Sequence, residues 1–251
     1  MHRFYLPPDQ CREGTLLLGG SEAHHARHVV RVQRGERVTV LDGEGGEFLC
    51  ELRDYDRDKV RLTVGERRSH PRPACQVTVV QALPKGKIIE SIIQKATELG
   101  AARIVPLLSE RVVTQLDEED ATRKALKLQL VAIEAIKQCG ACWLPKIEMP
   151  VAPEEFLARR EPCELPLIAS LQPGSRPARE YFSAFQAQHH RKPQTACVWI
   201  GPEGDFTPAE VSAIRSSGAQ PITLGRLVLR VETAAIYCLS ILHYELEPPP
   251  A

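Results

Sequence analysis

The part of this sequence most suited to chemistry is a glycine-bearing turn between an apolar segment and a helix start. Residues 196–200 are typical of a buried strand, and residues 201–204, Gly-Pro-Glu-Gly, interrupt that pattern. Thr207 and Glu210 then have the spacing of a capping box, with Pro208 at the first helical position. Backbone N–H groups and a helix N-terminus converge at such turns in α/β proteins, which favours a ligand site. A plain strand–helix connection is the alternative.

Two further loops share this character. Strand-like segments end at Leu171, Ile200 and Leu224, and a glycine-bearing or irregular loop follows each of them. The carboxyl ends of parallel strands lie on one side of a sheet, so these three loops could enclose one ligand. A terminal helix is predicted from Val231, with Glu232 in its first turn, where a negative charge is favourable.

The composition limits the class of protein. The 251 residues suffice for one large domain or two modest ones, and 32 basic residues balance 32 acidic ones. This balance argues against wrapping nucleic acid by bulk charge but leaves room for local basic patches. No apolar run approaches the roughly 20 residues that cross a bilayer, and the N-terminus lacks the apolar core of a signal peptide. We therefore expect a soluble, cytoplasmic protein with no membrane partner.

Two domains are predicted, at residues 1–72 and 73–251. The first contains short alternating strand-like runs and a hairpin signal, Asp-Gly-Glu-Gly-Gly, at residues 42–46, a pattern typical of a small β-barrel. The basic, proline-bearing residues 67–73 are the best candidate for a linker. Strand-like and helical runs then alternate, which predicts an α/β fold with a parallel sheet.

A basic, histidine-rich stretch lies in a short predicted helix near residues 22–32. His24 and His28 are one helical turn apart, as metal ligands can be, but no third ligand is evident. With Arg27 and Arg31 the stretch is locally cationic, which favours a surface that faces RNA. A purely structural surface or capping role is the alternative.

Lys85 and Lys87 flank the start of a second predicted helix, where positive charge opposes the helix dipole. The two lysines are therefore not expected to stabilise the helix, and binding of an anion such as an RNA phosphate is the functional interpretation.

The eight cysteines are expected to be reduced thiols, because no signal peptide precedes them. The single CxxC pair, Cys139 and Cys142, lacks the second pair of a zinc ribbon, so we expect no metal.

Several separated motifs together resemble the RsmE family, the 16S ribosomal RNA uridine-N3 methyltransferases of the SPOUT class. The matching segments are residues 3–4, 24–25, 42–43, 84–86, 94–100, 200–207 and 224–234. The resemblance thus covers essentially the whole chain. It implies a C-terminal SPOUT α/β domain with a deep trefoil knot, an N-terminal PUA-like β-barrel that helps to bind RNA, and a homodimer.

The resemblance also implies S-adenosyl-L-methionine as the cofactor and 16S rRNA, or the small ribosomal subunit, as the partner. The cofactor would be held mainly by backbone groups at Leu171, Ile200, Gly201, Pro202, Gly204, Leu224, Gly225, Leu227, Leu229 and Thr233. RNA would be bound by Arg3, His24, Arg27, Arg31, Lys85 and Lys87. The alternatives are a SPOUT methyltransferase acting on another RNA site and a ribosome assembly factor that binds RNA without catalysis.

The expected reaction requires the protein to position the reactants and to manage the proton and the charge on the uracil. Methyl transfer from a sulfonium is an in-line displacement, so the enzyme chiefly positions the methyl group and the attacking nitrogen. Uracil N3 is mostly protonated at neutral pH, so the site must remove a proton or stabilise charge on the carbonyl oxygens. Our hypothesis is that Arg230 faces these oxygens and that Glu232 is the base or orients Arg230. For Glu232, a simple charge at a helix N-terminus is the alternative.

Four positions depart from the usual pattern of the family. Asp205 stands where a further glycine is usual, and Val112 stands where a serine is expected. Lys137 and Ala141 replace the acid and the arginine of a Glu-Gln-Cys/Ser-x-Arg motif. The motif expected to bind the cofactor is nearly intact.

Overall fold

The computed structural model describes residues 1–112 and 116–247, which form two compact units. The first unit comprises Met1–Arg72 together with Ile133–Leu144. The second comprises Pro73–Ala132 and the chain from Pro145 onward. The last turns of helix α3 (Glu118–Cys139) therefore belong to the first unit, although they lie far beyond the linker in sequence.

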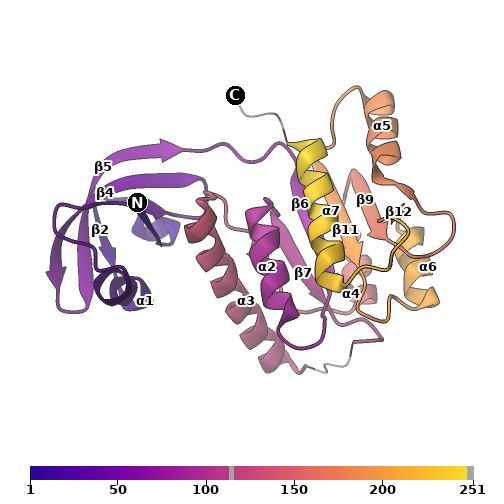
Figure 1. The fold of residues 1–251 in the computed structure, drawn as a ribbon, viewed down its shortest axis with the longest axis horizontal. Coiled ribbons are helices and arrows are strands. Elements are labelled where there is room, and N and C mark those ends of the chain that lie inside the picture. Colours follow the sequence, from indigo (N-terminus) through magenta and orange to yellow (C-terminus); the bar gives the residue numbers. More distant parts are fainter. Residues whose placement is uncertain (113–115, 248–251) are drawn as a thin grey trace. The chain divides into compact units, whose positions relative to one another are not determined.

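The first unit is built on a five-stranded sheet in the order β1-β3-β4-β5-β2 (Figure 1). Its strands are β1 (His2–Tyr5), β2 (Thr15–Leu18), β3 (Arg37–Leu41), β4 (Gly46–Asp56) and β5 (Lys59–Ser69). Only β1 and β3 are parallel. The predicted hairpin turn joins β3 to β4, where Asp42 Oδ1 accepts from the N–H groups of Glu44 and Gly46, each at 2.8 Å. The hairpin signal is therefore confirmed.

One short helical segment lies between β2 and β3, as predicted. It begins as α1 (Gly20–His24) and continues as a π-helical turn, His25–Val29. A separate 3-10 turn, Pro8–Gln10, lies between β1 and β2. Ala23 and Ala26 are its buried residues, and they pack into the apolar core of the sheet.

The second unit contains a seven-stranded, all-parallel sheet in the order β10-β12-β9-β11-β6-β7-β8 (Figure 1). Its strands are β6 (Gln76–Ala82), β7 (Arg103–Leu107), β8 (Lys146–Ile147), β9 (Leu165–Ala169), β10 (Arg176–Pro177), β11 (Thr195–Ile200) and β12 (Gln220–Thr223). The predicted mixed α/β fold with a parallel sheet is confirmed. The two-residue edge strands β8 and β10 were not predicted, because so short a segment carries no periodicity.

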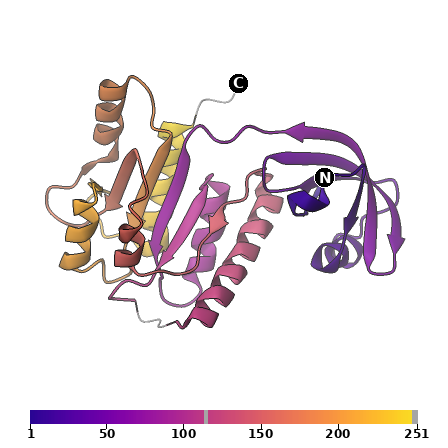
Figure 2. The ribbon, with the colours of Figure 1, turned by 180° about the vertical axis from the view of Figure 1, so that it is seen from behind.

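Helices cover both faces of this sheet. They are α2 (Ile88–Glu98), the first part of α3, α4 (Pro153–Ala158), α5 (Ala178–His189), α6 (Pro208–Ser216) and α7 (Val231–Leu246). Helices α2 and α7 pack side by side on one face (Figure 1), and α4 and α6 lie on the other (Figure 2). Trp199 of β11 packs edge-on against Phe156 of α4 and Phe206 before α6, with ring centroids 5.4 and 6.5 Å apart. Within the described residues no helix has the length and apolarity of a membrane span.

The start of α6 has the predicted capping box. Thr207 Oγ1 accepts from the Glu210 N–H at 3.3 Å, and Glu210 Oε2 accepts from the Thr207 N–H at 2.8 Å. The other oxygen of Glu210 accepts from the Glu110 N–H at 2.9 Å. Glu210 is only 4% exposed, so these three hydrogen bonds satisfy a carboxylate that would otherwise be costly to bury.

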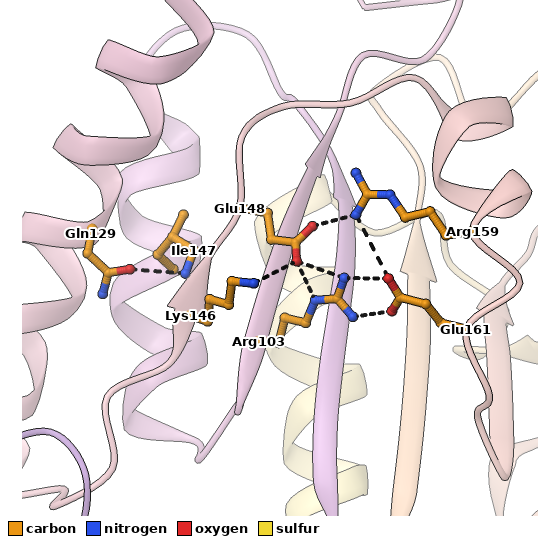
Figure 3. Close-up of polar contacts among 7 residues, drawn as sticks. All are labelled: Arg103, Gln129, Lys146, Ile147, Glu148, Arg159 and Glu161. Carbon is orange, nitrogen blue, oxygen red and sulfur yellow. Dashed lines mark hydrogen bonds and ion pairs between the residues drawn. The ribbon is translucent and has the colours of Figure 1, made fainter.

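A network of ion pairs links β7, the segment after β8 and the segment after α4 (Figure 3). Glu148 accepts from Arg103 Nε at 2.8 Å and from Arg159 Nη1 at 2.7 Å, and Arg103 also donates to Glu161. Burial alone would raise the pKa of Glu148, but the hydrogen bonds and charges of Arg159 and Arg103 outweigh it, so its pKa lies below the usual value. The Arg103 hydrogen bonds likewise lower the pKa of Glu161.

We expect Glu148→Gln to destabilise the second unit by about 2–3 kcal/mol at pH 7, because it removes the charge of a carboxylate that is only 11% exposed and that Arg103 and Arg159 share. A carboxyl whose folded-state pKa is lowered contributes stability above its unfolded pKa of about 4.3 and loses it as the pH falls through the folded value. The difference from the wild type in urea denaturation should therefore shrink below about pH 4. Glu119→Gln is the control, since Glu119 is 85% exposed and its pair with Arg123 should contribute less than about 0.5 kcal/mol. Equal midpoints for Glu148→Gln and the wild type at pH 7 would contradict this account.

Candidate active site

Three loops at the carboxyl edge of the parallel sheet enclose a cavity of about 850 Å³. They follow β9, β11 and β12, which are hydrogen-bonded neighbours in the sheet. The three strands are parallel, so their carboxyl ends meet, and the predicted convergence of the three loops is confirmed. A cavity of this volume is large enough for a small molecule of nucleotide size.

Most residues expected to hold a cofactor line this cavity. They are Leu171, Ile200, Gly201, Pro202, Leu224, Gly225, Leu227 and Leu229. Gly204 and Thr233 are not among the lining residues. The carbonyl of Gly204 accepts from Arg111 Nη1, and Thr233 is exposed in the first turn of α7.

Other lining residues were not predicted from the sequence to hold a cofactor. They include Ile88, Ser170, Pro173, Ser175, Glu203, Asp205, Thr223, Arg226 and Val228. All except Ile88 lie in the same three loops or, for Thr223, at the end of β12, so widening each predicted loop by a few residues would have found them. Ile88 is the first residue of α2, and no pattern in the sequence relates it to the loops.

The third loop leaves most of its peptide groups free. Gly225 has a φ of +111°, and no heavy atom outside its own neighbours lies within 4 Å of where a Cβ would be. Within the described part of the chain, the peptide groups of residues 226–229 have no backbone hydrogen-bond partner. Beside them lie the apolar side chains of Leu227 and Leu229. Unpaired peptide groups next to apolar side chains suit a ligand with a flat ring and polar edges.

The second loop is closed tightly on itself. A Cβ on Gly201 would lie 3.0 Å from Asp205 Oδ1 and 3.2 Å from the Phe206 nitrogen, so a side chain there would require the turn to open. Asp205 has a φ of +61°, and its Oδ1 accepts from the Phe206 N–H at 2.8 Å. An aspartate tolerates this left-handed backbone better than most residues, so the turn can hold Asp205 here in place of a glycine.

The start of α7 also lines the cavity. Arg230 is the exposed N-cap residue in an extended conformation, and Glu232 is half-buried in the first turn. No side chain caps this end of the helix, so its first N–H groups and the positive end of its dipole face the same region. The structure therefore places both predicted catalytic residues at the cavity, together with donors suited to developing negative charge.

Lys85 and Lys87 lie at the start of α2, and both are exposed. The backbone N–H of Lys85 donates to Glu203 Oε1 at 2.9 Å, which links this segment to the second loop of the cavity. Neither lysine lines the cavity, although Ile88, in the next position along the helix, does.

The remaining residues predicted to bind RNA lie in the first unit. The Arg27 guanidinium lies 4.9 Å from the centre of the Tyr55 ring, His24 packs against His28, and Arg31 is exposed. Arg3 differs from them, because its Nη1 donates to the carbonyls of Lys137 and Gln138 at 3.3 and 3.0 Å. Arg3 thereby caps the C-terminus of α3, where a positive charge is favourable.

All eight cysteines are free, as predicted. Burial raises the pKa of Cys50, Cys75 and Cys238 to about 12, so these are inert thiols of the core. Burial, together with the negative charges of Glu47 and Asp42, raises the pKa of Cys142 to about 11. None of these four is a nucleophilic thiolate at neutral pH.

Comparison with known proteins identifies the family. The family model described as RNA methyltransferase domain matches residues 70–243, and the one described as RNA methyltransferase PUA domain matches residues 18–65. The chain belongs to the ribosomal RNA small subunit methyltransferase E family. It is 32% identical to the member from Synechocystis, covering 98% of this chain and 78% of the relative, and 31% identical to the member from Bacillus subtilis, covering 98% of each.

Two solved structures extend the similarity to the fold. A methyltransferase from Legionella pneumophila, in complex with the bound cofactor SAM, is 30% identical with a TM-score of 0.86 and covers 96% of each chain. The ribosomal RNA small subunit methyltransferase E from Neisseria gonorrhoeae, bound to S-adenosyl methionine, is 25% identical with a TM-score of 0.83 and covers 97% of each chain. The resemblance inferred from the sequence motifs is confirmed.

Proposed function

We propose that this chain transfers a methyl group from S-adenosyl-L-methionine to N3 of a uridine in 16S ribosomal RNA. The cavity enclosed by the loops after β9, β11 and β12 carries the proposal. Structures of similar fold from Legionella and Neisseria were solved with this cofactor. The similar proteins from Synechocystis and Bacillus bear the name of a ribosomal RNA small subunit methyltransferase, which indicates the class of substrate.

The residues at the cavity suit this cofactor. The free peptide groups of residues 226–229 would hydrogen-bond the polar edges of its adenosine, and Leu171, Leu227 and Leu229 would pack against its ring. Gly225 leaves open space beside the loop, which a side chain would otherwise occupy. When bound, the cofactor supplies an electrophilic methyl group on a sulfonium.

The residues at the start of α7 would stabilise negative charge on the uracil and accept its N3 proton. Arg230, with the uncapped N–H groups of the helix, would stabilise negative charge on the carbonyl oxygens as the N3 proton leaves. Glu232 would accept that proton, or orient Arg230, from its half-buried position in the first turn. Both roles require only that the uridine enter the cavity beside α7.

RNA would be bound outside the cavity by basic residues of both units. Lys85 and Lys87 would contact phosphates at the start of α2. In the first unit, which contains the match to the PUA domain, His24, Arg27 and Arg31 would contact RNA. Arg3 has fewer donors left for RNA, because it also caps α3. A ribosomal RNA substrate suits the predicted cytoplasmic location.

We also propose that the chain acts as a homodimer, with the barrel and the trefoil knot that the resemblance implies. Large apolar side chains are uncovered near the cavity and along α7. Their exposed fractions are 60% for Leu171, 77% for Leu227, 78% for Val228, 46% for Tyr237 and 84% for Tyr244. Uncovered apolar groups in such number favour an interface with a second copy.

Mass spectrometry of 16S rRNA from a strain that lacks this chain tests the proposal. We expect the loss of one methyl group from one uridine, and its return when the wild-type chain is supplied. An unchanged pattern of modification would exclude the proposed substrate. Calorimetric titration with S-adenosylmethionine separates the alternatives, because an assembly factor without catalysis should give no heat, whereas a methyltransferase for another RNA site should still bind the cofactor.

A further inference from the structure

Three side chains of the first unit that can bind metals converge outside the cavity. They are Glu47 of β4, His70 directly after β5, and Cys142 in the segment after α3. One ligand atom from each lies within 4.8 Å of the other two, and His70 Nε2 lies 3.0 Å from Glu47 Oε2. Each residue is half-buried, so a small ion can reach the cluster.

Backbone hydrogen bonds hold the three segments in place. The Gly45 N–H donates to the Cys142 carbonyl at 2.9 Å, and the His70 N–H donates to the Gly45 carbonyl at 2.8 Å. Gly45 has a φ of +93°, and a Cβ there would lie 2.7 Å from the His70 carbonyl oxygen and 2.6 Å from Trp143. Only glycine allows this approach, so the arrangement of the three potential ligands is built into the fold.

The adjacent Trp143 strengthens the same contact. Its Nε1 donates to the carbonyls of His70 and Pro71 at 3.2 and 3.0 Å, and the Arg72 guanidinium lies 4.4 Å from the centre of its ring. The segment after α3 is thereby fixed at both Cys142 and Trp143 against the end of β5. These hydrogen bonds hold the backbone of the three segments in place, and only the side chains would adjust to an ion.

We propose that Glu47, His70 and Cys142 form a binding site for a zinc ion. Thiolate, imidazole and carboxylate are all ligands of zinc, whereas magnesium and calcium require a shell of oxygen atoms. In a tetrahedral zinc site, bond lengths of about 2.0–2.3 Å place ligand atoms roughly 3.3–3.8 Å apart, so rotamer adjustments of about 1 Å would complete the geometry. A water molecule would take the fourth position.

Zinc binding would bring together three segments that are distant in the sequence. On binding, the thiol proton of Cys142 leaves to the solvent, His70 binds as neutral imidazole and Glu47 as carboxylate. Arg68 lies 3.9 Å from Glu47 and 2.8 Å from Glu66, so the two carboxylates share its charge. The ion would cross-link the β3–β4 hairpin, the end of β5 and the segment after α3.

Titration of the full-length chain with Co²⁺, after treatment with a chelator and a reductant, tests the proposal. We expect one Co²⁺ per chain, a thiolate-to-cobalt charge-transfer band in the near ultraviolet, and its loss when Zn²⁺ displaces Co²⁺. Cys142→Ser should abolish the band. Loss of an outer-shell partner weakens a metal site by 10–100-fold, so His70→Gln and Glu47→Gln should each weaken binding by at least about 100-fold.

Cys139→Ser is the matched control, because Cys139 is the exposed partner of Cys142 in the CxxC pair and is not in the cluster. It should keep both the band and the affinity. The proposal is overturned if the wild type gives no band, or if Cys139→Ser weakens binding as much as Cys142→Ser does. Circular dichroism of each variant checks folding, and the two variants at His70 and Glu47 keep the test decisive if Cys142→Ser does not fold.

Discussion

Replacing Arg230 by alanine should lower the rate of methyl transfer by about 10²–10³-fold, the cost of removing one well-placed donor to a developing oxyanion. Arg230 is exposed, and its backbone rather than its side chain occupies the N-cap of α7, so the fold should persist. The effect should appear in kcat measured with saturating cofactor and RNA. S-adenosylmethionine affinity measured by calorimetry should stay within a few-fold of the wild type.

Arg226→Ala is the matched control for this experiment. Arg226 is also exposed and lines the same cavity, but it lies in the loop before the helix rather than at its N-cap. We expect its loss to change kcat by less than about 10-fold, since it lies apart from the helix N-terminus that would stabilise the oxyanion. Equal losses in the two variants would indicate a general need for positive charge, and an unchanged rate in Arg230→Ala would remove this residue from the mechanism.

The parts of the fold predicted correctly are those encoded by short-range signals. Strand β11 is an apolar run over residues 196–200, and the capping box at Thr207 and Glu210 is a local pattern of side chain and backbone. The convergence of the three loops also followed from the sequence, because parallel strands present their carboxyl ends together. These features require no knowledge of which distant residues meet.

The features that were missed depend on tertiary contacts. Lys146 and Pro177 belong to edge strands of two residues, which form only because a neighbouring strand is present. The grouping of the last turns of α3 with the first unit depends on contacts such as that from Arg3 to the Lys137 carbonyl, across 134 positions in the sequence.

The convergence of Glu47, His70 and Cys142 shows the same limit. Helical and CxxC spacing pair His24 with His28 and Cys139 with Cys142. The structure instead brings Cys142 to Glu47 and His70, two residues that share no spacing pattern with it. Gly45 provides this approach, but its sequence context predicts only a hairpin turn.

Gly225→Val should weaken S-adenosylmethionine binding by about 30-fold or more. The φ of +111° at Gly225 lies in a region that L-residues rarely adopt, and a β-branched side chain is the least tolerant of it. Holding the loop in its present shape would cost roughly 2–3 kcal/mol, which corresponds to about 30–150-fold in affinity if binding requires that shape. Calorimetric titration with the cofactor measures this loss.

Gly218→Val separates loss of the site from loss of stability. Gly218 has a similar φ of +104° but lies after α6 and does not line the cavity. Both variants should lower the melting temperature, because both force an L-residue into a left-handed backbone, yet only Gly225→Val should lose affinity for the cofactor. If Gly225→Val binds as tightly as the wild type, the third loop does not need its present backbone to hold the cofactor, and recognition must rest on the loops after β9 and β11.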